Sequence, residues 1–202
     1  MPTKKILTPL LADKYYHIYN RGNDKEKLFF TQANYRFFMN RYKELLQPYL
    51  RTFAYCLIGN HFHFLIKTNA SDDPLFHLKV SHQFRRLFQS YALAINKQEK
   101  RDGSLFRKYF RRIQVDDMDY LRHLVFYIHF NPQKHQIVQD FRKYQYSSYD
   151  TYSSQAFDTF LDIKSTLDWF NGYEDFINYH NVLHDERKLR KMTIEDDEGF
   201  QP

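Results

Sequence analysis

The sequence predicts an α+β fold, in which helices pack against an antiparallel sheet. Short segments rich in aromatic and β-branched residues, typical of strands, alternate with longer segments whose apolar residues recur at helical spacing. Along the chain these segments follow the order β-α-β-β-α-β-α. The part β-α-β-β-α-β is the order of a ferredoxin-like or RRM-like core, and the last segment adds one helix.

The first half of the chain contains the clearest pair of strands. We expect a strand, a helix and two further strands at 13–20, 31–47, 51–58 and 61–67. Thr31 can cap the helix and Pro48 ends it. Gly59 and Asn60 separate the paired strands by a turn.

The second half is expected to be mainly helical. It contains a helix, a strand and a second helix, at 74–98, 109–116 and 118–130. Asp116 or Asp117 can cap the second helix. Asn131–Pro132 is expected to end it, since a residue that precedes proline avoids the helical conformation. Mostly loop is expected over 133–160, then two short helices over 162–182 split at Asn171–Gly172, and a charged, frayed end beyond Asp185.

Composition is consistent with one domain and an appendage. The 202 residues are 43% hydrophobic, enough for a sizeable core, and only 5 Gly and 6 Pro argue against a disordered or fibrous chain. We expect a domain over residues 1–150 and a C-terminal helical extension over residues 151–202.

The chain is basic, with a net charge of +6 and a pI of about 9.2. A basic protein attracts polyanions such as nucleic acid or an anionic membrane surface. A membrane role is not expected, because no apolar run is long enough to span a bilayer and the N-terminal residues lack the apolar h-region of a signal peptide. The single cysteine, Cys56, excludes an intramolecular disulfide and suits a reducing cytoplasm.

A pair of histidines lies on the second of the adjacent strands. Alternate residues of a strand share a face, so His61 and His63 point the same way, with about 6–7 Å between their Cα atoms. Their rings can converge on one metal ion, although two polar residues on a wet strand face would show the same pattern.

The helix expected at 118–130 carries a polar stripe. Tyr127 and Asn131 are four residues apart and are therefore neighbours on its surface. Tyr120 lies on the same stripe about two turns earlier, and His129 lies on the opposite side. Taken alone, this pattern also fits an aromatic helix packed on the sheet.

Basic and aromatic residues are interleaved in two further clusters. They are Arg85, Arg86, Arg107, Lys108, Tyr109, Arg111 and Arg112. The cations can track phosphates and the tyrosine can stack on bases, which predicts binding of a nucleic acid. A solvated basic edge is the alternative interpretation.

Several motifs recur in a specific order. They are Tyr16–Gly22, Asn60 with His61–Phe62–His63, Gly103–Phe106, Tyr127–Pro132 and Tyr146–Tyr149. Together they resemble the HUH-type single-tyrosine transposases, which include insertion-sequence transposases and REP-associated tyrosine transposases. The resemblance runs from about residue 13 to 150. Gln133 departs from it, since many relatives are apolar there, and we expect little consequence.

The resemblance implies a mechanism. A divalent metal, Mg²⁺ or Mn²⁺ in the working enzyme, would lie on His61 and His63 with Asn131 as third ligand, although Zn²⁺ or Ni²⁺ can bind more tightly. Tyr127 would be the nucleophile, forming a 5′-phosphotyrosine and freeing a 3′-hydroxyl. The implied partner is single-stranded DNA next to a hairpin.

Other interpretations stay open on the sequence alone. The protein could be an inactive DNA-binding regulator, or a water-using, metal-dependent phosphodiesterase in which Tyr127 is structural. Tyr91 is a competing nucleophile, and Cys56 with the histidines could form a zinc site that lacks a recognised fourth ligand. A monomer acting in cis is favoured by the very short connection before residue 118, and a homodimer is the alternative.

Overall fold

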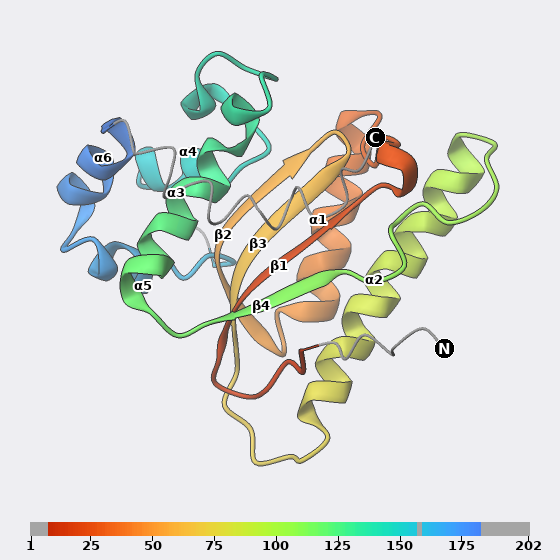
Figure 1. Cartoon of the computed structure of the whole chain (residues 1–202), viewed down its shortest axis with the longest axis horizontal. Coiled ribbons are helices and arrows are strands. Elements are labelled where there is room, and N and C mark those ends of the chain that lie inside the picture. Colours follow the sequence, from red (N-terminus) through yellow and green to blue (C-terminus); the bar gives the residue numbers. More distant parts are fainter. Residues whose placement is uncertain (1–7, 157–158, 183–202) are drawn as a thin grey trace, which may run out of the picture.

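The computed structural model describes residues 8–156 and 159–182 and confirms the α+β prediction. Four strands form one antiparallel sheet in the order β2-β3-β1-β4, so β1 and β3 lie at its centre. In Figure 1 this sheet lies between α3 on one side and α1 and α2 on the other. The strands are β1 (Tyr15–Arg21), β2 (Leu50–Ile58), β3 (His61–Thr68) and β4 (Arg111–Val115).

The helices follow the predicted order. They are η1 (Asn23–Lys25), α1 (Gln32–Leu46), α2 (Phe76–Gln98), α3 (Met118–Lys134), η2 (Phe141–Lys143), α4 (Tyr149–Ser153), α5 (Ile163–Trp169) and α6 (Tyr173–Asn181). The segment expected to be mostly loop therefore contains the two short helices η2 and α4. The charged end expected to fray beyond Asp185 lies outside the described residues.

One boundary prediction is wrong. Helix α3 does not end at Asn131–Pro132 but continues to Lys134, with Pro132 inside it. The missing N–H of Pro132 costs only one hydrogen bond in the last turn, and the His135 N–H still donates to the Asn131 carbonyl at 3.0 Å. Asn131 and Pro132 are both buried, so packing overrides the local preference of a residue that precedes proline.

The start of α3 is fixed by Asp117, the second of the two predicted caps. Its carboxylate accepts a hydrogen bond from the Tyr120 N–H at 2.7 Å. Only Asp116 and Asp117 connect β4 to α3. The helix that carries Tyr127 is therefore held close to the edge strand of the sheet.

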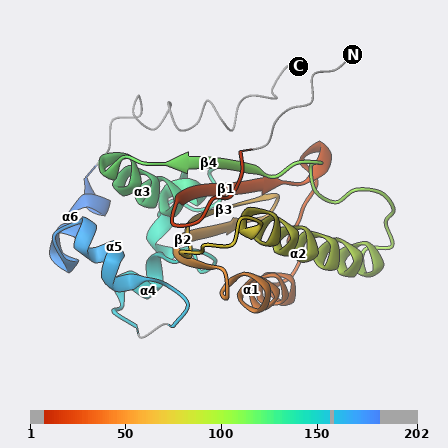
Figure 2. The ribbon, with the colours of Figure 1, turned by 90° about the horizontal axis from the view of Figure 1, so that it is seen from below.

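One face of the sheet packs on α1 and α2. The rings of Phe64 and Tyr42 stack with centroids 4.3 Å apart, and Phe62 contacts Phe38 at 5.3 Å. Figure 2 shows α1 and α2 together below the sheet, and α3 to α6 gathered at one end of the molecule. The apolar residues that alternate with the histidines of β3 thus form the main core.

The segment after residue 159 packs on the edge of β2. Trp169 stacks on Phe53 with ring centroids 4.8 Å apart, and Leu161 forms a bridge with Thr52. Arg51 and Asp162 form an ion pair at 2.9 Å. The described part of the predicted extension therefore lies against the same sheet that carries the histidines.

A buried polar network joins α3 to α6. His129 Nδ1 lies 3.0 Å from His180 Nε2, and His129 Nε2 lies 2.8 Å from the Ser148 hydroxyl. Ser148 also accepts a hydrogen bond from the Tyr55 N–H at 2.9 Å. Burial lowers the pKa of His129 well below its usual value, so the ring stays neutral. This network confirms that His129 faces away from Tyr127.

We expect Ser148→Ala to destabilise the protein by about 1–3 kcal/mol, because it removes the hydroxyl that contacts the buried His129 ring and the Tyr55 N–H. Urea unfolding followed by circular dichroism measures this. Ser154→Ala is the control, since its hydroxyl is exposed and bonds only to the carbonyl of Asp150. Equal stability of the two variants would contradict this role of the network.

Candidate functional site

The sheet face opposite α1 and α2 collects the polar residues of the site. In an antiparallel sheet, directly paired residues point to the same face. His63 pairs with Cys56 on β2 and with Tyr19 on β1, and His61 pairs with Arg21. The predicted sharing of one face by His61 and His63 is therefore confirmed, and β1 adds further residues to that face.

Helix α3 brings the nucleophile candidate to this face. His61 Nε2 lies 3.0 Å from the side-chain oxygen of Asn131. The ring of Tyr127 meets the ring of His63 edge-on, with centroids 5.7 Å apart. Tyr127 and Asn131 are both fully buried. The structure thus brings together the four residues His61, His63, Tyr127 and Asn131, which are up to 70 positions apart in the sequence.

Two residues that sequence reasoning did not assign orient the histidines. His17 Nε2 on β1 lies 2.9 Å from His63 Nδ1, and the Asn60 side-chain oxygen lies 2.7 Å from His61 Nδ1. Contacts of this kind fix the tautomer and the ring angle of metal-binding histidines. The only sequence pattern that pointed to His17 as a site residue was the motif Tyr16–Gly22, to which it belongs.

The donor set fits a cation. Both ring nitrogens of His61 face amide oxygens, from Asn60 and Asn131, yet a neutral imidazole has one N–H to donate. A cation between His61 Nε2 and the Asn131 oxygen would satisfy two lone pairs that otherwise face each other. The side-chain oxygen of Asn131 faces His61, and its buried amide nitrogen makes no hydrogen bond with the described residues.

A cysteine-containing zinc site gains no support. Cys56 is fully buried next to His63, and burial raises the pKa of its thiol well above the usual value, which opposes the thiolate that zinc requires. Within residues 8–156 and 159–182, no group of three or more His, Cys, Asp or Glu side chains is placed to hold a metal. An amide oxygen would therefore have to complete a site on the two histidines.

The hydroxyl of Tyr127 has a cationic neighbour. Lys134 Nζ donates to it at 3.4 Å, and the same ammonium lies 5.0 Å from the ring centroid. Lys134 follows Tyr127 by seven residues, two helical turns, so both project from the same side of α3. Sequence reasoning missed this contact because it expected the helix to end before Lys134.

Tyr91 is placed away from the site. It lies on α2, on the other side of the sheet, where it is fully buried and its hydroxyl donates to the Leu28 carbonyl at 2.7 Å. Burial raises the pKa of this phenol strongly. The position and the protonation of Tyr91 both disfavour it as a nucleophile.

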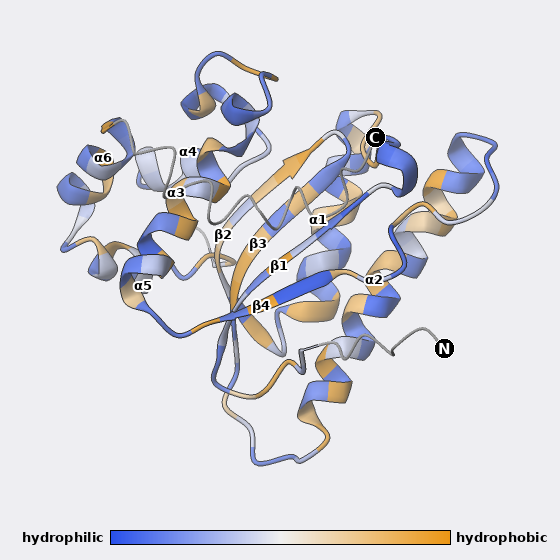
Figure 3. Cartoon of the chain, viewed as in Figure 1, coloured by the Kyte–Doolittle hydropathy of each residue, from blue (hydrophilic) through white to orange (hydrophobic). Residues whose placement is uncertain are grey.

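The basic residues predicted to bind nucleic acid divide between the two faces. Arg111 pairs with Tyr19 and shares the face of His63, whereas Arg112 faces α2, where it bonds to Ser81 at 2.9 Å and lies over the Phe110 ring. Arg85 and Arg86 are exposed on α2, and Lys108 and Tyr109 are exposed before β4. Figure 3 shows that β4, the edge strand, is mostly hydrophilic.

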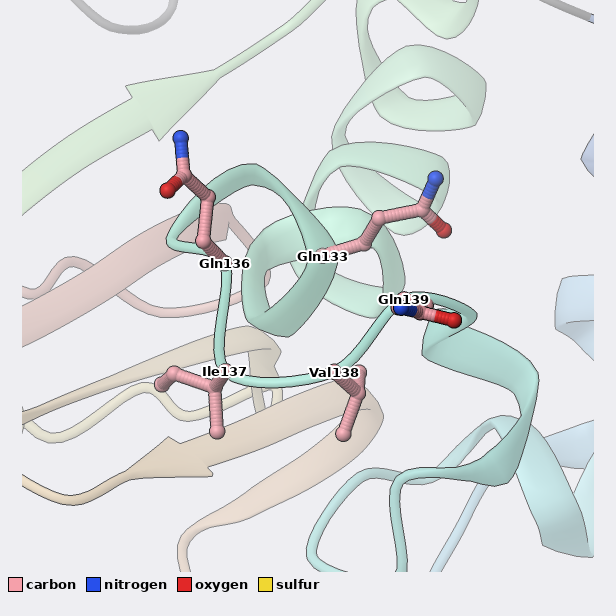
Figure 4. Close-up of a pocket in the computed structure, with 5 residues that line it drawn as sticks. All are labelled: Gln133, Gln136, Ile137, Val138 and Gln139. Carbon is pink, nitrogen blue, oxygen red and sulfur yellow. The ribbon is translucent and has the colours of Figure 1, made fainter.

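A shallow pocket lies beyond the C-terminal end of α3. Figure 4 shows the residues that line it, which are Gln133, Gln136, Ile137, Val138 and Gln139. These amide and aliphatic side chains include neither a nucleophile nor a titratable group, so the pocket is not a candidate reaction site. Gln133, the departure from the family pattern, accepts a hydrogen bond from the Phe141 N–H at 3.1 Å.

Among the residues that the structure describes, no helix is both long and apolar enough to cross a membrane.

A tyrosine helix packed on a sheet that carries a His–hydrophobic–His pair is the arrangement expected from the resemblance to the HUH-type single-tyrosine transposases. The comparisons with known proteins agree with this resemblance. No family model matches the chain. A Haemophilus influenzae protein carries the name REP-associated tyrosine transposase by inference. It is 29% identical to this chain over 119 residues, which cover 55% of this chain and 66% of the relative.

A solved structure agrees with the sequence comparison. It is a REP-associated tyrosine transposase bound to a REP hairpin, and it is similar with a TM-score of 0.61 over 78% of this chain and 89% of that one. At 15% sequence identity this likeness concerns the fold. The predicted family is thus supported by one relative in sequence and by another in fold.

We expect Tyr127→Phe to change the free energy of unfolding by less than about 1 kcal/mol, because it removes one hydroxyl whose partner, Lys134, can reach solvent. Tyr127→Ala should instead cost about 3–5 kcal/mol, since it empties a fully buried aromatic position. Chemical unfolding of the three proteins measures both values. An unfolded Tyr127→Phe protein would show that the hydroxyl itself holds the helix in place.

Proposed function

We propose that this protein cleaves and rejoins single-stranded DNA next to hairpins, through a covalent link between Tyr127 and a 5′-phosphate. The observation that carries the proposal is the meeting of Tyr127 with His61, His63 and Asn131 on one sheet face. Structural packing alone does not require a phenol, an amide oxygen and two imidazoles to converge in one buried place.

His61, His63 and Asn131 would hold a divalent metal, Mg²⁺ or Mn²⁺, and when bound such an ion polarises a phosphate oxygen and offsets negative charge. His17 and Asn60 orient the two imidazoles for this purpose. The mixed imidazole and amide set leaves coordination positions open for a substrate.

Tyr127 supplies the nucleophile. Its phenol oxygen attacks phosphorus and loses its proton, the bond from phosphorus to the 3′ oxygen breaks, and that oxygen leaves as a 3′-hydroxyl after taking up a proton. Rejoining reverses these steps, with a 3′-hydroxyl attacking the phosphotyrosine. The phosphotyrosine ester conserves the energy of the phosphodiester bond, so rejoining the DNA strands needs no nucleotide cofactor. Lys134 holds the Tyr127 hydroxyl in orientation by donating to it.

The basic surface and the relatives support the choice of substrate. The solved relative is bound to a REP hairpin, and the chain has a net charge of +6. A DNA substrate is consistent with the predicted cytoplasmic location. The two-residue connection between β4 and α3 favours a monomer acting in cis over a homodimer that exchanges α3.

We expect a covalent protein–DNA adduct when the protein is incubated with hairpin-bearing single strands from the flanks of its own gene. The strand is labelled at its 3′ end, because the link carries the piece downstream of the cut. Tyr127→Phe should form no adduct on a denaturing gel, whereas Tyr120→Phe, on the same helix, should form it normally.

Each other outcome of this experiment selects a different function. An adduct on Tyr91, Tyr109 or Tyr120, located by peptide mapping, would move the nucleophile within the same enzyme class. Cleavage without an adduct would identify a water-using phosphodiesterase. Binding with neither would identify a DNA-binding regulator.

We expect His63→Ala to weaken Mn²⁺ binding more than about tenfold, since even groups that only orient metal ligands are worth that much. Cleavage should be lost while DNA affinity changes little, because phosphate contacts elsewhere supply most of it. Titration calorimetry measures the metal, with His82→Ala on α2 as the control. Wild-type cleavage by His63→Ala in chelator-treated buffer would place the metal elsewhere.

A further inference from the structure

Arg21 is the last residue of β1 and belongs to the motif Tyr16–Gly22, of which the proposed function uses only His17. It pairs with His61 across the sheet and therefore shares the face of the histidines. Its position is fixed on both sides, because the Gly22 N–H donates to the Asn60 carbonyl at 2.8 Å and the Arg107 N–H donates to the Arg21 carbonyl at 3.0 Å.

Two of the three guanidinium nitrogens of Arg21 make no hydrogen bond within the described part of the chain. Its Nε and one terminal nitrogen, Nη2, are buried and make no hydrogen bond with the described residues. Burying such donors without an acceptor is unfavourable, and more so for a charged group. An acceptor that approaches from outside the described residues would remove this cost.

Two more arginines surround Arg21. Burial lowers the pKa of the Arg107 guanidinium, and the neighbouring charges of Arg21 and Arg111 lower it further, while Asp24 acts in the opposite direction. Arg111 lies on the same sheet face, since it pairs with Tyr19. Three cations gathered next to the histidines are typical of a site that binds an anion.

We propose that Arg21, flanked by Arg107 and Arg111, forms a subsite that binds a backbone phosphate of the DNA strand beside His61. This inference rests on the proposed function, because a nucleic acid is the anion that the function brings to this face. The planar fork of an arginine matches two oxygens of one phosphate, which a lysine cannot do. Arg21 would thereby set the position of the strand relative to Tyr127.

A purely structural role for Arg21 makes different predictions. An arginine that stabilises the fold through partners lowers the melting temperature when it is replaced. Because two buried nitrogens of Arg21 make no hydrogen bond with the described residues, Arg21→Met should instead leave the melting temperature unchanged or raise it. The methionine keeps much of the apolar stem and removes only the guanidinium.

The test measures DNA binding in a Tyr127→Phe background, so that it does not depend on cleavage. Affinity for a short oligothymidylate is followed by fluorescence anisotropy at several salt concentrations. For single strands, each lost phosphate contact lowers the slope of log affinity against log salt by about 0.7. We expect Arg21→Met to lower the slope by about this amount and to weaken binding about tenfold or more.

Two matched variants sharpen the result. Arg21→Lys keeps the charge but loses the fork, so it should keep the slope and still bind more weakly. Arg41→Met is the control, because Arg41 is also half-buried but lies on α1 and pairs with Glu44. It should change neither the slope nor the affinity.

Adding inorganic phosphate distinguishes a subsite for free phosphate from a subsite for a phosphate of the DNA backbone. Both phosphate and oligothymidylate should raise the melting temperature of the Tyr127→Phe parent more than that of Arg21→Met. Stabilisation by free phosphate alone, with an unchanged DNA salt slope in Arg21→Met, would overturn the DNA subsite. A clear fall in the melting temperature of Arg21→Met would also overturn it, in favour of a structural role. Failure of the proposed function appears separately, as a wild-type protein that forms no adduct.

Discussion

The candidate site depends above all on the antiparallel register between β1 and β3. That register places Tyr19 opposite His63 and Arg21 opposite His61, and it brings the ring of His17 to His63. Because side chains alternate along a strand, a slip of one residue would send both histidines toward α1 and α2 and would move Phe62 and Phe64 to the face under α3. The aromatic packing of Phe62 and Phe64 on α1 and α2 therefore does more than stabilise the fold: it selects the one register in which the polar face is assembled.

The second requirement is the position of α3. Asp117 sets its first turn, and the i, i+4 spacing then projects Tyr127 and Asn131 together toward β3. On its other side the helix is held by His129, through Ser148 and His180. The C-terminal segment thus has a definable role in the described part of the chain, since α6 supplies one of the groups that fix the rotation of the tyrosine helix.

Much of the fold and the central part of the site could be predicted from local patterns. The alternation in β3 and the helical spacing of Tyr127 and Asn131 are visible in short windows of sequence. The contacts of His17, Arg21 and Lys134 could not be predicted in this way, because each depends on a pairing or a helix end decided by packing. The burial of Arg112 under α2 was hidden for the same reason, since alternation separates it from Arg111 only once the faces of β4 are known. The end of α3 was mispredicted because a local rule for proline competes with the burial of Asn131 and Pro132.

The two-residue connection between β4 and α3 also has a mechanical consequence. A tether of two residues spans about 10 Å at most between the flanking Cα atoms, so the start of α3 cannot travel far from the sheet edge. Any larger swing of Tyr127 would have to pivot there and pull His129 out of its buried contacts. Under the proposed function, two DNA ends would have to reach one phosphotyrosine in turn. The tyrosine helix would then stay in place, and the exchange of strands would come from movement of the DNA.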